Sequence, residues 1–295
     1  MKRTLLSLAT AALLFTSTSC ADKTCATADK ELALIPVPQE MTVGSDCFTL
    51  TRRAAITLDT SNEELKGIAR YFNEKIAPAA GFELPVEKHG KIEFKLTDDA
   101  ALGDEGYHLK VKHGDILLTA NKPVGIFYGV QTLLQMLPAE IKSMTEQPKD
   151  KKWTIPCVDI IDKPQFAWRG MMLDVSRHWF NKEEVMKFID ELAEYKMNVF
   201  HWHLSDDQGW RLEIKSLPKL TEVGAWRADR VGDWWGRERA QQGEKATYGG
   251  FYTQEDVKEV LAYAAQRFVR VIPEIDVPGH GVAALVAYPE LACMK

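Results

Sequence analysis

The chain has 295 residues, which is enough for two domains, or for one domain beside part of another. Hydrophobic residues make up 45 % and charged residues 27 % of it, a composition typical of a globular protein. The net charge of -5 provides no basic surface for gathering nucleic acid, so no nucleic-acid partner is expected.

Residues 1–20 have the pattern of an export signal peptide. A basic start is followed by an apolar run to Phe15 that is too short to span a bilayer. Cys20 follows small residues, as in the cleavage box of bacterial lipoproteins, although Ser17 stands where that box usually has Leu. This predicts membrane attachment through a lipid on Cys20, with simple cleavage near Ala21 as the alternative. Both readings predict an exported protein, either periplasmic or an outer-membrane lipoprotein.

Short strands and two helices alternate after the signal. Helical apolar spacing covers Asn62–Ile76 and Pro123–Leu137. The strand-like segments are "AAITLD", "KIEFKL", "GYHLKV" and "DILLTA". The last two flank the tight turn "KHGD" and should form a hairpin. The pattern predicts an N-terminal α+β sandwich domain over residues 30–150.

Two polar segments of this domain have no catalytic pattern. "GDEGY" at 103–107 contains two carboxylates, but it opens the hairpin and is expected to be a solvated turn. Residues 139–152, "AEIKSMTEQPKDKK", are charged and contain a Pro, so they are expected to link two domains.

Strand and helix patterns alternate regularly over residues 160–295. Apolar runs "GMMLDVS", "NVFHWHL" and "FVRVIPEIDV" are separated by helical patterns at Lys182–Lys196 and Thr253–Arg267, the second opened by Thr253 with Asp256 in capping-box spacing. We expect these apolar strands to be buried on both faces, and such strands alternating with helices are typical of parallel α/β folds. The fold is either an open doubly wound sheet or a (β/α) barrel, and the lack of a Gly-rich loop after the first strand disfavours nucleotide binding.

Each of these three strands runs directly into polar residues. The ends read "LDVSRHW", "FHWHLSDD" and "PEIDVPGH". One such end is ordinarily a solvated loop. Three on the same edge of a parallel sheet predict a shared pocket, because active sites of barrels lie at the carboxyl ends of the strands.

His201 and His203 should lie on one face of their strand, since side chains alternate with a period of two. Paired His on a strand also suits a metal, and His280 with Asp276 could add ligands. Several Arg side chains in the neighbourhood would repel a divalent ion, so we expect no metal. A metal-dependent barrel hydrolase is the first alternative function.

All eight Trp lie between positions 153 and 235. Trp rings stack on sugar rings but also fill protein cores. Core packing is expected for Trp168 and Trp202. Trp234 and Trp235 lie in a stretch rich in Gly and charge, which predicts a loop over the pocket.

At these residues the sequence resembles β-N-acetylhexosaminidases of glycoside hydrolase family 20. The similar segments are "WRGMMLDVSRHWF", "NVFHWHLSDDQGWRLEI" and "RVIPEIDVPGHGVAALVAYPEL", together with the upstream hairpin "GYHLKV". The resemblance implies an N-terminal family domain followed by a (β/α)8 catalytic barrel. It also implies an exo-acting retaining enzyme that removes terminal N-acetylglucosamine or N-acetylgalactosamine, with the substrate's acetamido oxygen as nucleophile and no cofactor.

The resemblance assigns roles to three residues. Arg177 should bind the sugar hydroxyls, as a fork of donors suits that task, with a salt bridge to Asp174 as the alternative. Asp206 and His280 should form a catalytic relay behind the general acid/base Glu. Asp207 is expected to cap a loop. The implied partner is a glycan ending in N-acetylhexosamine.

The chain departs from the family pattern at the catalytic Asp-Glu pair. That pair normally lies at the fourth strand, and no such segment follows Pro278; the only "GDE", Gly103–Glu105, precedes the hairpin. Residues 169–295 hold at most three βα units of an incomplete (β/α)8 barrel, which takes about 250 residues when closed. We therefore expect the pair beyond Lys295 and no activity from this chain alone. A non-catalytic sugar-binding protein is the second alternative.

Overall fold

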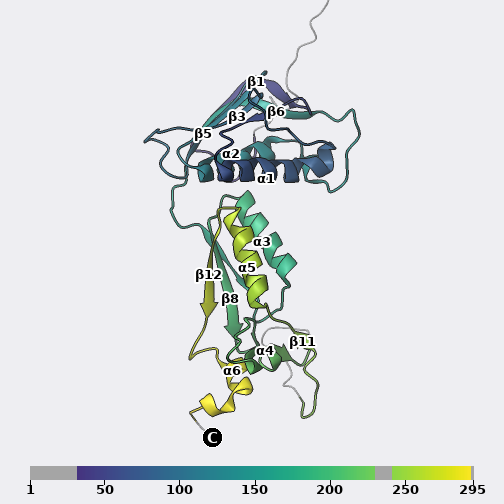
Figure 1. The fold of residues 1–295 in the computed structure, drawn as a ribbon, viewed down its shortest axis with the longest axis vertical. Coiled ribbons are helices and arrows are strands. Elements are labelled where there is room, and N and C mark those ends of the chain that lie inside the picture. The colour runs from purple at the N-terminus through teal and green to yellow at the C-terminus, as the bar shows by residue number, and fades with distance from the viewer. Residues whose placement is uncertain (1–31, 230–240, 294–295) are drawn as a thin grey trace, which may run out of the picture.

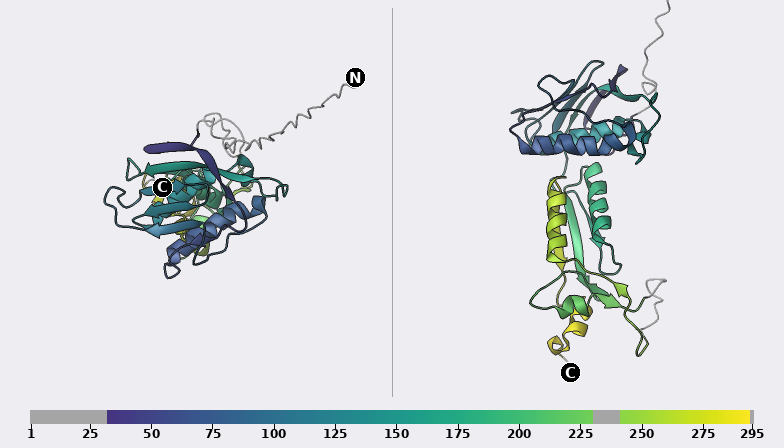
Figure 2. Two further views of the ribbon diagram at one scale, coloured as in Figure 1. Left: turned by 90° about the horizontal axis from the view of Figure 1, so that it is seen from above. Right: turned by 45° about the vertical axis from the view of Figure 1, so that its right-hand side comes forward.

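The computed structural model describes residues 32–229 and 241–293, which form two parts placed end to end (Figure 1). The N-terminal domain is a sheet with helices on one face, and the C-terminal part is a narrower group of strands and helices that extends away from that helix layer (Figure 2). No helix in the two described ranges is both long and apolar enough to cross a bilayer. The predicted signal peptide, residues 1–20, lies outside these ranges.

The N-terminal domain is built on a six-stranded mixed sheet. In sheet order its strands are β1 (Glu40–Leu50), β6 (Trp153–Asp162), β4 (Tyr107–Val111), β5 (Ile116–Ala120), β3 (Ile92–Leu96) and β2 (Ile56–Thr57). The predicted hairpin is confirmed, since β4 and β5 pair antiparallel with Tyr107 opposite Ala120. Every second residue of both strands is buried, as expected for a sheet with one covered face.

Strand β6 shows that the prediction of an interdomain linker at residues 139–152 was wrong. The strand pairs with both β1 and β4, so it is an inner strand of the first sheet. The polar segment before it therefore joins two elements of one domain and contains the short 3-10 helix η1 (Ala139–Lys142). Pro156 hid this strand from sequence reasoning, because Pro is disfavoured inside sheets except at bulges. It lies opposite Cys47, where the β1–β6 register shifts.

Two helices cover one face of this sheet (Figure 1). Helix α1 (Glu63–Ala80) begins where the Asn62 side chain accepts a hydrogen bond from the Leu65 N–H at 3.0 Å. It ends at Gly81, whose φ of 72° suits glycine. Helix α2 (Pro123–Met136) begins with Pro at its first position, as predicted, and is buried over most of its length.

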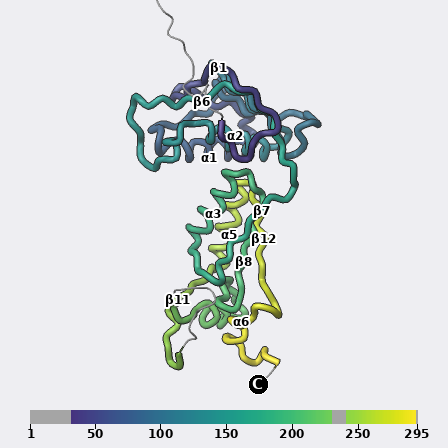
Figure 3. The backbone as a smooth tube through the Cα atoms, turned by 180° about the vertical axis from the view of Figure 1, so that it is seen from behind, coloured from purple at the N-terminus to yellow at the C-terminus, as the bar shows by residue number. Residues whose placement is uncertain are grey.

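The C-terminal part has the predicted alternation of strands and helices. Its main elements are β7 (Gly170–Asp174), α3 (Lys182–Glu194), β8 (Val199–Asp206), α5 (Gln254–Ala265) and β12 (Arg270–Ile275). The three strands are parallel in the order β12-β8-β7 and lie side by side (Figure 3). Helix α5 opens with the predicted capping box of Thr253 and Asp256. The shorter elements are β9 (Gly209–Trp210), α4 (Lys219–Glu222), β10 (Trp226–Arg227), β11 (Tyr248–Gly249), α6 (Val282–Ala287) and η2 (Pro289–Leu291).

Burial of these strands follows their place in the sheet. The central strand β8 is almost entirely buried, as predicted for an apolar parallel strand. The flanking strands β7 and β12 expose Met171, Met172 and Ile275, so the prediction that they are buried on both faces was wrong. The α/β class with a separate N-terminal domain is confirmed, and closure into an eight-stranded barrel stays a prediction.

Helices α3 and α5 are each followed by a residue with left-handed backbone whose side chain contacts the N-terminal domain. Lys196 has a φ of 59°, and its Nζ donates to Tyr107 Oη at 2.9 Å and lies 3.1 Å from Asp162 Oδ2. Phe268 has a φ of 56°, and its ring centre lies 5.2 Å from that of Phe127 in α2. This conformation costs a non-glycine residue about 1–2 kcal/mol, which the contacts between the two parts offset.

Glu105 links the two parts as well, so the expected solvated turn at 103–107 was wrong for this side chain. Its two carboxylate oxygens accept hydrogen bonds from Arg169 Nη2 at 3.0 Å and Nη1 at 3.1 Å. Asn198 Nδ2 donates to the same carboxylate at 3.2 Å. Arg169 immediately precedes β7 and Asn198 immediately precedes β8. The N-terminal domain therefore holds the amino ends of two parallel strands, and the carboxyl ends lie at the far end of the molecule.

Candidate active site

The three parallel strands carry polar side chains at the same level near their carboxyl ends. Asp174 of β7 is the register partner of His203 in β8, and His203 is the register partner of Glu274 in β12. Register partners on neighbouring parallel strands project to the same face of the sheet. The strands thus build a row of two carboxylates with an imidazole between them.

Arg177 lies in the turn after β7 and binds two carboxylates. Asp174 shapes the turn, because its Oδ1 accepts hydrogen bonds from the backbone N–H groups of Ser176 and Arg177 at 3.0 Å each. Its Oδ2 accepts from Arg177 Nη1 at 2.8 Å, and Arg177 Nη2 forms an ion pair with Asp206 Oδ2. The salt bridge to Asp174, foreseen as the alternative role of Arg177, is present together with the contact to Asp206.

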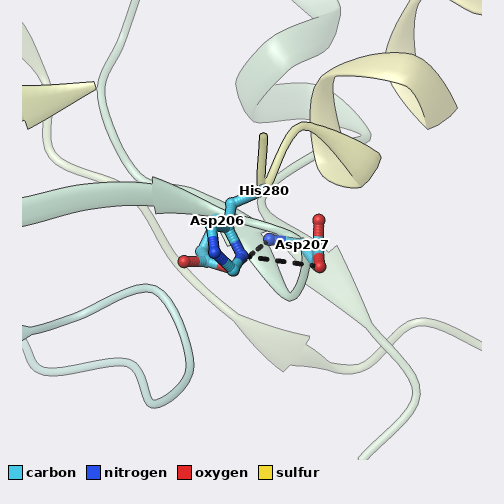
Figure 4. Close-up of side chains that lie close together, drawn as sticks. All are labelled: Asp206, Asp207 and His280. Atoms are coloured by element: carbon cyan, nitrogen blue, oxygen red, sulfur yellow. Dashed lines mark hydrogen bonds and ion pairs between the residues drawn. The ribbon is translucent and has the colours of Figure 1, made fainter. Parts of the chain in front are cut away.

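Asp206 is the most buried ionisable residue of this cluster, with a side chain 1 % exposed. Its Oδ1 accepts a hydrogen bond from the Asp207 N–H at 2.7 Å, and its Oδ2 lies 2.8 Å from His203 Nε2. His280 Nδ1 lies 3.1 Å from Asp206 Oδ1 (Figure 4). The three residues proposed from the sequence, Arg177, Asp206 and His280, therefore meet at one carboxylate.

His280 and Asp207 lie on the loop side of the cluster. His280 follows β12, has a left-handed backbone with a φ of 53°, and is half-exposed. Asp207 Oδ1 accepts a hydrogen bond from the N–H of Val282, the first residue of α6, at 3.2 Å. The second oxygen of Asp207 is 3.8 Å from His280 Nδ1 (Figure 4). This geometry agrees with the expected capping role of Asp207.

Glu274 was not identified from the sequence. The placement of His201 and His203 on one face is confirmed, because Glu274 Oε2 lies 2.6 Å from His201 Nε2 and 2.6 Å from His203 Nδ1. Burial opposes the charge of His203, but contacts with Glu274 and Asp206 outweigh it and raise its pKa. Burial likewise opposes the charge of Glu274, but the two imidazoles hold its pKa below the usual range.

The paired His do not form the metal site considered from the sequence. His201 and His203 converge on Glu274, while the Asp276 N–H donates to Ser205 Oγ at 2.9 Å. Among residues 32–229 and 241–293, the group close enough to share a cation is Asp206, Asp207 and His280, with ligand atoms within 4.8 Å of one another. Asp206 in that group already faces a guanidinium and an imidazole, which disfavours a cation there.

Arg211 frames the rim of the site through contacts with the backbone of the surrounding loops. It is fully buried, and its guanidinium donates only to backbone carbonyls, those of Val175, Ser176, Ala225 and Gly250. Burial lowers its pKa to about 10, helped by the charge of Arg227. Arg211 thus ties the turn that carries Arg177 to two other loops.

The Trp predictions had mixed outcomes. Trp202 is fully buried and packs against Phe200 and Tyr252, as predicted. Trp168 is 63 % exposed, so its predicted core position was wrong. Trp234 and Trp235 lie outside the described residues.

A hollow of about 270 Å³ lies elsewhere, beside Arg169 and Lys196 at the junction of the two parts. Arg169 is paired there with Glu105, and Lys196 is paired with Asp162. The chemistry gathers instead at the opposite ends of the strands, where Asp206 lies.

Known proteins resemble both parts of the chain. Residues 31–163 match glycosyl hydrolase family 20, domain 2, and residues 166–295 match the catalytic domain of the same family. The β-hexosaminidase of Porphyromonas gingivalis is 42 % identical over 270 residues, which cover 90 % of this chain and 33 % of that protein. The β-hexosaminidase of Vibrio furnissii is 39 % identical, covering 88 % of this chain and 40 % of that protein.

Solved structures agree with these relatives. The Streptomyces plicatus N-acetyl-β-hexosaminidase in complex with Thio-NAglucal is 40 % identical, with a TM-score of 0.78 over 88 % of this chain and 49 % of that one. The chain thus spans less than half the length of these relatives. With both family domains matched in order over nearly its whole length, the chain belongs to glycosyl hydrolase family 20.

Proposed function

We propose that the complete protein containing this chain is an exo-acting β-N-acetylhexosaminidase that removes terminal β-linked N-acetylglucosamine or N-acetylgalactosamine from a glycan. The observation that carries the proposal is the meeting of Arg177, Asp206 and His280 at the carboxyl ends of parallel strands. The relatives named β-hexosaminidase support the same reaction class. No cofactor is required by this chemistry.

Arg177 is the group we assign to the substrate. Its guanidinium is held by Asp174 and Asp206, which fixes its plane and offsets its charge. A fixed fork of donors suits two neighbouring sugar hydroxyls better than a flexible ammonium would.

Asp206 and His280 form the relay of the proposed mechanism. Asp206 Oδ1 faces His280 Nδ1 at 3.1 Å, so the carboxylate orients the half-exposed imidazole. The other ring nitrogen is then available to a general acid/base carboxyl group. We propose that this Glu and the neighbouring Asp that orients the substrate's acetamido group lie beyond Lys295, and that residues 1–295 alone do not turn over substrate.

Hydrolysis by the complete gene product tests this proposal. Purified protein should release 4-nitrophenol from the N-acetyl-β-glucosaminide and not from the corresponding β-glucoside, which lacks the acetamido nucleophile. Proton NMR should show the β-anomer of the sugar as the first product, because the mechanism retains configuration. Binding of N-acetylglucosamine without any turnover would instead favour a sugar-binding protein, and loss of turnover on chelation would favour a metal-dependent hydrolase.

We also propose that the protein is exported and held at a membrane by a lipid on Cys20, with a free periplasmic enzyme as the alternative. Expression with labelled palmitate tests it. Label in the wild type that is lost in Cys20→Ser supports the lipid anchor, and an unlabelled protein in the periplasmic fraction supports simple cleavage.

A further inference from the structure

Glu274 joins the β12 strand to the proposed site through the imidazoles of β8. One carboxylate oxygen, Oε2, lies 2.6 Å from His201 Nε2 and 2.6 Å from His203 Nδ1. Glu274 and His203 are register partners on adjacent strands, so the strand pairing places the two residues opposite each other. The contact between Glu274 and His203 therefore joins two residues that are held by paired strands, not two side chains of flexible loops.

His203 stands between Glu274 and Asp206. Its Nδ1 faces Glu274, and its Nε2 lies 2.8 Å from Asp206 Oδ2. The ring is buried, with a side chain 4 % exposed, so water does not compete for either nitrogen. The orientation of this ring is set by the two carboxylates.

The protonation state of His203 decides whether the arrangement is stable. A ring with protons on both nitrogens carries a positive charge between the two carboxylates and presents an N–H at Nε2 to Asp206, whereas a neutral ring has a lone pair on one of its nitrogens. The charged groups around the ring are Asp174 and Arg177 on the β7 side, Asp206 on its own strand and Glu274 on β12. Arg177 Nη1 lies 3.1 Å from His203 Nε2 and disfavours the protonated ring. Glu274 offsets this repulsion.

We propose that Glu274 is a positioning residue for the hydrolysis, acting through His203 on Asp206. By keeping both ring nitrogens of His203 protonated, Glu274 makes Nε2 a donor that fixes Asp206 Oδ2. Asp206 Oδ1 then stays directed at His280. This inference rests on the proposed function, and it assigns that function a residue outside the relay of Asp206 and His280.

Removal of the Glu274 charge should disturb first the contact of His203 with Asp206 and then the contact of Asp206 with His280. A neutral His203 keeps one ring proton, and Arg177 Nη1, 3.1 Å from Nε2, can donate to a lone pair there, which favours the tautomer protonated at Nδ1. Nε2 of that tautomer faces Asp206 Oδ2 with a lone pair at 2.8 Å. Asp206 rotates to relieve this repulsion, and its contact with His280 is lost. His280 is half-exposed, so it has no dense packing to keep it in place.

Turnover by the complete gene product, with the 4-nitrophenyl N-acetyl-β-glucosaminide as probe, gives the first test. Glu274→Gln keeps the size of the side chain and removes its charge. We expect kcat to fall about 10- to 100-fold, the size of the effect when the carboxylate that orients a metal-bound His is removed, while KM changes little. Glu255→Gln on the exposed face of α5, where the carboxylate contacts only Lys258, is the matched control and should retain wild-type kcat.

A double-mutant cycle separates positioning through His203 from any direct role. In a His203→Asn background, adding Glu274→Gln should change kcat by no more than about twofold, because the intermediary is already gone. If the two losses multiply instead, Glu274 does not act through His203 and the proposal is overturned. Equal thermal midpoints of the variants exclude loss of folded protein as the cause.

The ¹⁵N shifts of the His203 ring test the same proposal without turnover. At neutral pH they should report two protonated nitrogens in the wild type and in Glu255→Gln, and one in Glu274→Gln. Unchanged shifts in Glu274→Gln would overturn the positioning role. If the wild type fails to hydrolyse the probe, the proposed function fails, and the shifts still decide whether Glu274 controls His203.

Discussion

Lys196 and Asp162 come from different parts of the chain and form a buried ion pair, with Nζ 3.1 Å from Oδ2. Lys196 follows α3, and Asp162 is the last residue of β6. Burial lowers the pKa of Lys196, while the charge of Asp162 acts in the opposite direction. The Tyr107 hydroxyl donates to the same carboxylate at 3.0 Å. The two parts are therefore joined by a desolvated polar cluster as well as by the covalent chain.

Two replacements of Lys196 should distinguish the effect of its charge on stability from the effect of its left-handed backbone. Lys196→Gly relieves a left-handed conformation that costs about 1–2 kcal/mol, but it leaves Asp162 buried without its partner, a loss of about 3–5 kcal/mol. The net fall in unfolding free energy should be about 1–4 kcal/mol. Lys196→Met loses the pair and keeps the strain, so it should be the less stable variant. Urea denaturation measures the unfolding free energy of both variants. A Lys196→Gly variant as stable as the wild type would contradict the expectation that losing the ion pair costs more than relieving the strain gains.

Glu105 and its neighbour Asp104 offer a matched comparison of two ion pairs. Glu105→Gln removes the charge that holds Arg169 at both nitrogens, and should lower the unfolding free energy by about 2 kcal/mol, as expected for a charged hydrogen-bonded contact. Asp104→Asn breaks only an exposed pair with Lys122 and should cost about 0–1 kcal/mol. Equal effects in thermal unfolding would show that Glu105 does not clamp the strands.

Asp190 should make the junction of the two parts sensitive to acid. Burial opposes its charge, but Lys75 from α1 and Arg267 after α5 outweigh burial and lower its pKa. A lowered pKa means that the unfolded chain binds protons first. The stabilisation is thus complete above the unfolded value of about 3.9 and is lost as the pH falls through the folded value. Unfolding measured from pH 6 to pH 3 should show a shallower decline for Asp190→Asn than for the wild type; parallel curves would contradict this.

Arg177→Lys should impair hydrolysis by the complete gene product. An ammonium cannot contact Asp174, Asp206 and a sugar in the plane that the guanidinium provides. We expect kcat/KM for the aryl N-acetyl-β-glucosaminide to fall about 100-fold, the usual cost of losing one preorganised donor. Arg70→Lys on the exposed surface of α1 is the control. A loss below threefold would remove Arg177 from the substrate site.

Local patterns predicted most helices and strands, because capping residues and apolar spacing are encoded within a few positions. Strand β6 was missed because its place in the sheet depends on β1 and β4, which are distant in sequence. Residues 139–152 before it resembled an interdomain linker because the strand that follows them was not recognised as part of the first sheet. Core packing was predicted for Trp168 because the large apolar ring of Trp is usually buried, whereas its position in the connection to β7 leaves it exposed.

Site residues at or just after the carboxyl end of an apolar strand could be predicted from the sequence. Arg177, Asp206 and His280 each come shortly after an apolar run, and parallel strands bring such positions together. Glu274 lies within β12, and only the register with β8 shows that it faces His203. A single sequence contains no such register.

The residues with left-handed backbone after α3 and α5 limit which N-terminal domains can replace the one in this chain. Lys196 and Phe268 belong by sequence to the strand-and-helix half, yet their side chains are complementary to the sheet half. A chimaera that exchanged the first 162 residues for those of a distant homologue would leave two strained turns without the contacts that offset them. Successful grafts must therefore transfer these two positions with the domain that they contact.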